Sequence, residues 1–479
     1  GYSAEFAVTM TLGGYAKLFR ESPNPVLAER THDIVDLERA LLRHLTGRPQ
    51  DELGQLSSPV VLLAHNLTPG ETAKLKPEFV LGFVTEIGGM TGHTAIVARG
   101  LGIPAVVGIG RFLTRVTGRE QVIVDGNRGL VILDPDEETL AQYAGELARQ
   151  KKVAAELEPL WHLPAETQDG VRIQLMANIE YPTEAMACLE RGADGIGLYR
   201  TEFLYATQHG QPSEEDHFQA YAAVVRAMQG RPVVIRTLDL GADKMRLTPA
   251  DTDDEPNPFL GLRSIRLSLR NPEIFVPQLR AILRASALGD VRVMFPLITT
   301  LPELQLAKDV LGQAMSELRE RGVPFCSEIP VGMMVESPAA AVLIDCFVKE
   351  VDFISIGTND LVQYTLAVDR SNPVVANLFQ TADPAVLRLI AASLRAAREA
   401  GVKASLCGQM SAHAVYTMLL LGLGLRELSV PPTALPEIKQ VCRSVTVAQC
   451  EAVAARARTL DSASKIETFL REEFQKLRF

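Results

Sequence analysis

The sequence predicts an α/β protein in which a C-terminal (β/α)8 TIM barrel follows a small α/β domain and a helical N-terminal segment. The main observation is that short apolar strands alternate with helical patterns over about 310 residues after Thr167. This region contains no glycine-rich dinucleotide turn, which favours a barrel over an open doubly wound sheet. A separate group of short apolar runs lies between Pro59 and Pro135 and predicts the smaller domain.

Composition narrows the class of protein. The 479 residues are 47% hydrophobic and 22% charged, which is typical of globular domains. The net charge of −10 disfavours nucleic-acid binding. The longest strongly apolar run, Met418–Leu425, is far shorter than the roughly 20 residues that cross a membrane, so we expect no membrane insertion. The six cysteines form no C-x-x-C pair and the start resembles no secretory signal, which favours a cytoplasmic protein.

The N-terminal third divides into three predicted parts. Residues 1–48 are expected to be helical, because apolar side chains recur at three- and four-residue spacing after Val26. Residues 49–135 contain short apolar runs at 60–64, 80–84, 122–125 and 130–133 around one predicted helix, 94–100. Residues 136–166 begin with a charged, alanine-rich stretch that predicts a long connecting helix.

Residues 167–479 form the predicted barrel. Its strand candidates are short apolar runs: Ile173–Ala177, Gly195–Leu198, Val233–Ile235, Val291–Phe295, Val331–Val335, Phe353–Ile356 and Ala404–Leu406. Polar side chains follow five of these strands: Arg200, Arg236, Glu336, the pair Asn359 and Asp360, and Cys407. Barrel enzymes build their active sites at the C-terminal ends of the strands, so this pattern predicts one shared pocket.

His93 lies in the glycine-rich run Gly88–Gly108. The predicted helix that begins near Ala95 would place His93 at a helix N-terminus, where the backbone amides and the dipole stabilise a phosphoryl group on the imidazole. The same dipole disfavours protonation and keeps the ring nucleophilic. The alternative is a capping or core histidine.

Four arginines, Arg200, Arg236, Arg263 and Arg370, are candidate ligands for a small, highly anionic substrate. Guanidinium groups bind phosphate and carboxylate in a bidentate way. The alternative for each of them is a structural salt bridge, for example between Arg263 and Asp239.

Glu336, Asp360 and Cys407 supply the remaining candidate chemistry. Two carboxylates at the ends of adjacent strands, together with a substrate phosphate, are typical ligands of Mg²⁺. The alternative is that they pair with the arginines. A strand-end thiol could serve as an acid or a nucleophile, although cysteine is often a small core residue.

These motifs together resemble enzyme I of the bacterial phosphoenolpyruvate:sugar phosphotransferase system. The resemblance runs from about Ala4 to the C-terminus. It rests on Gly-Gly-Met-Thr-Gly-His-Thr-Ala, Leu-Tyr-Arg-Thr-Glu-Phe-Leu-Tyr, Arg-Thr-Leu-Asp-Leu-Gly-Ala-Asp-Lys, Asn-Pro-Phe-Leu-Gly-Leu-Arg and the run from Ser355 to Arg370, in the family's order.

The resemblance implies a role for each candidate residue. His93 would be the phosphorylated histidine on a swivelling domain, and Cys407 would protonate the enolate to give pyruvate. Phosphoenolpyruvate would be bound by Arg200, Arg236, Arg263, Asn359, Asp360 and Arg370. Glu336 and Asp360 would hold Mg²⁺. The resemblance further implies the histidine phosphocarrier protein HPr as acceptor and a homodimeric barrel domain.

The sequence departs from the family pattern in three places. Residues 1–48 correspond only to the last helices of the family's helical domain that docks the phosphocarrier, which predicts a remnant of that domain. Gln409 stands where the family usually has Glu, and Leu262 where a tryptophan is frequent.

Two other functions fit parts of the pattern. A phosphoenolpyruvate-sensing regulatory homologue would keep the pocket without turnover. A fragment of a relative of pyruvate phosphate dikinase or phosphoenolpyruvate synthase would share the histidine loop and the barrel.

Overall fold

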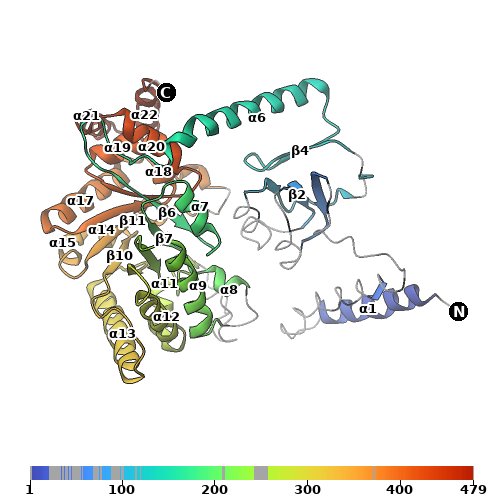
Figure 1. The fold of residues 1–479 in the computed structure, drawn as a ribbon, viewed down its shortest axis with the longest axis horizontal. Coiled ribbons are helices and arrows are strands. Elements are labelled where there is room, and N and C mark those ends of the chain that lie inside the picture. The colour runs from blue at the N-terminus through green and yellow to red at the C-terminus, as the bar shows by residue number, and fades with distance from the viewer. Residues whose placement is uncertain are drawn as a thin grey trace. The chain divides into compact units, whose positions relative to one another are not determined.

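The computed structural model divides into two compact units, Gly1–Pro135 and Asp136–Phe479, which are described separately (Figure 1). It describes residues 3–20, 34, 37, 41–42, 45, 56, 58–67, 75, 78–87, 98, 102–113, 116–118, 120–207, 211–241, 257–370, 372 and 374–477. The finer boundaries at 48/49 and 166/167 stay predictions.

The described residues of the first unit include one long helix and two small sheets. Helix α1 spans Ala4–Arg20. A parallel sheet has the order β1-β2-β3, and β4 and β5 form an antiparallel pair. The strands are β1 (Val60–Ala64), β2 (Val80–Thr85), β3 (Ala105–Val106), β4 (Val122–Asp125) and β5 (Leu130–Leu133).

A small core fixes the β1-β2-β3 sheet. Phe83 is fully buried and packs with Leu67, Leu75 and Ala98, among others. The four predicted strands of this unit are confirmed, and β3 is an additional one. The helix expected at 94–100 lies outside the described residues apart from Ala98, which is helical, and His93 lies outside them as well.

The second unit is a closed barrel of eight parallel strands in the order β6 to β13, which confirms the predicted fold class. Its strands are β6 (Gln174–Ile179), β7 (Ile196–Tyr199), β8 (Val233–Arg236), β9 (Val291–Phe295), β10 (Val331–Val335), β11 (Phe353–Gly357), β12 (Lys403–Cys407) and β13 (Glu427–Val430). Seven match the predicted strands, and β13 was not predicted.

Helices cover the outside of the barrel (Figure 1). The longer ones are α9 (Glu214–Ala227), α12 (Pro272–Ser286), α13 (Leu301–Glu320), α17 (Pro384–Ala400), α20 (Leu435–Ser444), α21 (Val447–Ala457) and α22 (Ala463–Gln475). Shorter segments are α7 (Glu184–Glu190), α8 (Phe203–Thr207), α11 (Ser264–Arg270), α14 (Pro338–Val342), α15 (Ile344–Phe347), α16 (Thr358–Leu366), η4 (Ala376–Leu378), α18 (Gln409–Ala412), η5 (Ala414–Tyr416) and α19 (Thr417–Gly422). Most apolar side chains on these helices and on the outer faces of the strands form one continuous core.

The predicted long helix before the barrel is confirmed as α6 (Glu137–Leu157), followed by the 3-10 turn η3 (Glu158–Leu160). Its C-terminal end is attached to the barrel by Lys439, whose Nζ donates to the carbonyls of Trp161 at 2.8 Å and Gly192 at 3.2 Å. A Cβ at Gly192 would lie 1.7 Å from the Trp161 oxygen, so this approach requires glycine.

Strand alternation decides which side chains point into the barrel. Side chains along a strand point in turn to opposite faces. On β8, Val233 and Ile235 pack with the outer helices, whereas Val234 belongs to a separate cluster inside the barrel. Arg236 is two residues beyond Val234 and therefore points inward at the C-terminal mouth.

The same rule places the other inward groups. Leu198, Met334 and Cys407 belong to the interior cluster with Val234. Arg200 and Glu336 each lie two residues beyond an interior side chain. Every strand of the barrel is parallel, so these strand-end groups all lie at one mouth.

Candidate functional site

The mouth of the barrel holds a continuous chain of ion pairs. Arg236 contacts Glu202 at 2.8 Å and Asp239 at 2.8 Å. Asp239 also pairs with Arg263 at 2.9 Å, and Arg263 lies 3.5 Å from Asp360. The structure therefore brings two of the predicted arginines together and also contains the predicted Arg263–Asp239 salt bridge.

Asp360 connects this chain to a further arginine. Its Oδ1 lies 3.2 Å from Arg370, and Arg370 is held by its backbone N–H, which donates to Gln363 at 3.2 Å. Arg200 is also at the mouth, but it pairs with Glu180, which follows β6, at 2.8 Å. Each of the four predicted arginines is thus paired with a carboxylate, which is the salt-bridge alternative, and their role as substrate ligands stays a prediction.

Three buried polar atoms of this cluster lack a hydrogen-bond partner among the described residues: Nε of Arg236, Nη1 of Arg370 and Oδ1 of Asp360. The contact between Asp360 and Arg370 is an ion pair without hydrogen-bond geometry. Buried polar atoms normally find partners. Two unsatisfied cationic donors and one anionic acceptor at the same mouth fit a site that takes an anion together with a cation.

Two buried carboxyl groups of the mouth differ in their pKa. Burial alone would raise the pKa of Asp239, but Arg236 and Arg263 hold it below its usual range. The pKa of Glu336 is raised, first by burial and then by the neighbouring charges of Asp239 and Asp360. An added positive charge beside Glu336 would relieve this repulsion.

Glu336 has a fixed position. It is 2% exposed, and its Oε1 accepts a hydrogen bond from the backbone N–H of Leu297 at 2.6 Å. Leu297 has a φ of 48°, in the left-handed region that non-glycine residues rarely adopt. Gly357, on the neighbouring strand, leaves room for the carboxylate, because a Cβ there would lie 2.8 Å from Glu336 Oε2.

Glu336 and Asp360 fit a divalent cation of the magnesium type. Within the described part of the chain, no cluster of three or more histidine, cysteine or acidic side chains is arranged as a complete metal site. Mg²⁺ is usually held by one or two carboxylates together with substrate phosphates and water. The raised pKa of Glu336 and the unsatisfied Oδ1 of Asp360 match that arrangement.

Asn359 and Cys407 lie on neighbouring elements of the mouth. The backbone N–H of Gln409 donates to Asn359 Oδ1 at 2.9 Å, which leaves the amide nitrogen of Asn359 as the donor. This contact does not depend on the side chain of Gln409, which is exposed. Gly408 has a φ of 108°, and a Cβ there would lie 2.9 Å from Asn359 Oδ1, so only glycine allows this turn.

Cys407 is 3% exposed, and burial raises the pKa of its thiol. The thiol therefore keeps its proton at neutral pH, as an acid requires. Its Sγ accepts a hydrogen bond from Ser355 at 3.6 Å, and its backbone carbonyl accepts one from Thr358 at 3.0 Å.

Two residues at the site were not among the predicted ones: Glu202 pairs with Arg236, and Ser355 contacts Cys407. The contact of Asp239 with Arg236 was not predicted either, although its contact with Arg263 was. The sequence could have indicated Ser355, because it is a polar residue inside an otherwise apolar predicted strand. No comparable signal identifies Glu202, because charged residues in strand-to-helix loops are common.

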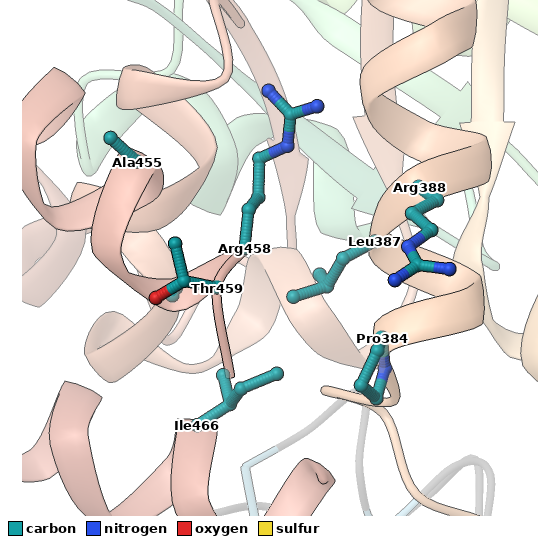
Figure 2. A pocket seen from close by; sticks show the side chains of 8 residues that line it. Pro384, Leu387, Arg388, Ala455, Arg458, Thr459 and Ile466 are labelled. Atoms are coloured by element: carbon teal, nitrogen blue, oxygen red, sulfur yellow. The ribbon is translucent and has the colours of Figure 1, made fainter. Parts of the chain in front are cut away.

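A separate surface pocket of about 330 Å³ lies between α17 and the turn that joins α21 to α22 (Figure 2). Arg388 and Arg458 are among its lining residues, with Leu387 and Ile466 as apolar neighbours. None of the predicted site residues lines it.

Two protein-family models match the chain. A family model described as the PEP-binding domain of PEP-utilising enzymes matches residues 154–447. A second model, described as their mobile domain, matches residues 56–129.

Three curated relatives carry the name phosphoenolpyruvate-protein phosphotransferase. Those of Bacillus sp. strain S and Geobacillus stearothermophilus are each 43% identical over 472 residues, covering 98% of this chain and 82% of the relative. That of Staphylococcus carnosus is 42% identical over 455 residues, covering 95% of this chain and 79% of the relative.

Proposed function

Because the chain belongs to the family of phosphoenolpyruvate-protein phosphotransferases, we propose that it moves the phosphoryl group of phosphoenolpyruvate to its own His93 and then to a histidine of HPr, with release of pyruvate. One observation carries the assignment of the site: four arginines, a protonated thiol and the buried carboxyl groups of Asp239, Glu336 and Asp360 share one mouth of the barrel. This is the set of groups that an enol phosphate with a carboxylate requires.

Arg236 and Arg370 would bind the anionic groups of phosphoenolpyruvate, with Arg200 and Arg263 close by. The unsatisfied Arg236 Nε and Arg370 Nη1 support this role. The amide nitrogen of Asn359 would donate a further hydrogen bond. Since partner carboxylates hold all four arginines in place, the donors are oriented before the substrate arrives, which lowers the cost of reorganisation in the transition state.

Glu336 and Asp360 would hold a divalent cation, Mg²⁺, whose charge would offset that of the phosphoryl group in transfer. The raised pKa of Glu336 supports this, because a cation there would favour the ionised carboxylate.

His93 would attack phosphorus, forming the N–P bond while the bond from phosphorus to the enol oxygen breaks. Cys407 would then give its proton to the methylene carbon of the enolate, which completes pyruvate. The thiolate that remains would regain a proton from water. The buried, protonated thiol at the mouth supports this assignment.

We further propose that residues 49–135 swivel as a phosphohistidine domain and that the barrel forms a homodimer in the cytoplasm. No helix in the described ranges has the length and apolar character needed to span a membrane, and all six cysteines are free. Large apolar side chains, including Val342 and Val374, are exposed on the barrel unit and would suit an interface. Light scattering that gives the monomer mass at micromolar concentration would refute the dimer.

Pyruvate release tests the proposed reaction. With phosphoenolpyruvate, Mg²⁺ and HPr, we expect continuous turnover in an assay coupled to lactate dehydrogenase. Removal of the cation with EDTA and the substitution His93→Ala should each abolish it. Turnover of His93→Ala at the wild-type rate would overturn the proposal.

A further inference from the structure

Ser355 is a buried hydroxyl inside the barrel beside the thiol of Cys407. It lies on β11 two residues before Gly357, which is paired in register with Cys407 on β12. Ser355 is fully buried, and its Oγ donates to Cys407 Sγ at 3.6 Å. A hydroxyl without a hydrogen bond is costly in such a place. Among the described residues, the thiol is the one hydrogen-bond partner of this hydroxyl.

The direction of this hydrogen bond determines how the S–H group of Cys407 is oriented. Because β11 runs toward the mouth, Ser355 lies deeper in the barrel than Gly357 and Cys407. The hydroxyl therefore donates to sulfur from below. The proton of the thiol is not used in this contact and can point toward the mouth, where Arg200, Arg236 and Glu336 lie.

We propose that Ser355 is a positioning residue for the acid step, which donates a hydrogen bond to Cys407 Sγ so that the thiol proton faces the substrate carbon. The proposal rests on the proposed function. When the S–H bond breaks and the C–H bond of pyruvate forms, the electron pair stays on sulfur. The Ser355 hydroxyl then stabilises the thiolate, since hydrogen bonds to charged atoms are stronger than those to neutral ones.

Charged groups also act on this sulfur. Glu336 from the end of β10 disfavours the thiolate, whereas Arg236 and Arg200 from the ends of β8 and β7 favour it. Ser355 is the uncharged member of this set and the one in hydrogen-bond contact with the sulfur. Its effect should therefore be confined to proton transfer at carbon, whereas loss of either arginine would also affect the binding of substrate.

Exchange of the methyl protons of pyruvate isolates this step. In D₂O with Mg²⁺ and no phosphoryl donor, the thiolate form of Cys407 removes a proton from pyruvate and returns deuterium. Loss of the methyl signal in proton NMR measures the rate. We expect Ser355→Ala to slow exchange by about tenfold, as loss of one hydrogen bond to a charged atom does. Ser355→Thr, which keeps the hydroxyl, should restore most of the rate.

The neighbouring Ser405 provides the control. It is also buried, but its hydroxyl donates to the carbonyl of Ile354 at 3.5 Å rather than to the thiol. Ser405→Ala should therefore exchange pyruvate at nearly the wild-type rate. Formation of phosphohistidine from phosphoenolpyruvate in one turnover is measured in parallel, because a general folding defect would slow both reactions together.

Two results separate the inference from the proposed function. If the wild-type protein exchanges pyruvate and Ser355→Ala does so equally fast, the role of Ser355 is wrong and the function stands. The role is wrong as well if both reactions slow equally in Ser355→Ala. If the wild-type protein neither exchanges pyruvate nor forms phosphohistidine, the proposed function itself fails.

Discussion

Replacement of Gly357 by alanine tests how closely the barrel mouth is built around Glu336. The added Cβ would lie 2.8 Å from Glu336 Oε2 and 3.0 Å from Met334 Cγ, whereas ordinary van der Waals contact begins at 3.4 Å. Glu336 cannot easily move aside, because it is buried and its other oxygen accepts the hydrogen bond from Leu297. We expect overpacking to cost about 1–3 kcal/mol of unfolding free energy.

The functional effect should be larger than the effect on stability. A change in the groups that position a metal-binding carboxylate typically lowers metal affinity by about 10–100-fold. The Mg²⁺ concentration at half-maximal pyruvate release should rise by that factor in Gly357→Ala. Gly312, on α13, is the control, because a Cβ there meets nothing within 4 Å. Gly312→Ala should leave the Mg²⁺ dependence unchanged. If Gly357→Ala responds to Mg²⁺ as the wild type does, Glu336 does not hold the cation in the way described.

Three further substitutions probe the barrel. Arg236→Lys replaces a guanidinium group that contacts two carboxylates with a single ammonium group, and it should slow pyruvate release by about 100-fold or more. Arg292 pairs with Asp290 at the start of β9, and the control Arg292→Lys should leave the rate of pyruvate release nearly unchanged. Burial lowers the pKa of His217 from its ordinary 6.5 to about 4. Between pH 6.5 and pH 4 the unfolded chain therefore binds more protons than the folded protein, so the free energy of unfolding falls as the pH drops. Urea unfolding should show a loss of up to about 3 kcal/mol from pH 7 to pH 4 for the wild type, and a clearly smaller one for His217→Gln. Lys439→Met leaves the carbonyls of Trp161 and Gly192 without their buried donor and should lower the free energy of unfolding by about 1–3 kcal/mol. The fluorescence emission of Trp161, the single tryptophan, should shift to the red. An unchanged spectrum would argue that Lys439 does not attach this segment to the barrel.

The barrel could be predicted because its strands are short apolar runs, whereas in its helices apolar residues recur at three- and four-residue spacing. The exception is β13, Glu427–Val430, where Glu427 and Ser429 interrupt the apolar pattern directly after an apolar helix. Its place is decided by pairing with β12 and β6, which closes the barrel. Such long-range pairing leaves no local mark on the sequence.

The candidate site could be predicted only in part. Arg236 and Glu336 follow apolar runs, and the parallel direction of the strands brings their side chains to one mouth. The partners of these groups come from loops whose path is set by the whole fold. Asp239 turns back onto Arg236, and Leu297 adopts a positive φ to reach Glu336. Neither arrangement follows from residue type or spacing.

The location of the phosphoryl group tests the central claim most directly. After one incubation of the protein with phosphoenolpyruvate and Mg²⁺, mass spectrometry of peptides prepared at alkaline pH should find one acid-labile phosphate on the peptide that contains His93. The phosphate should be absent in His93→Ala and strongly reduced in Arg236→Ala. Phosphate on another residue, or its persistence in His93→Ala, would contradict transfer from the barrel mouth to this imidazole.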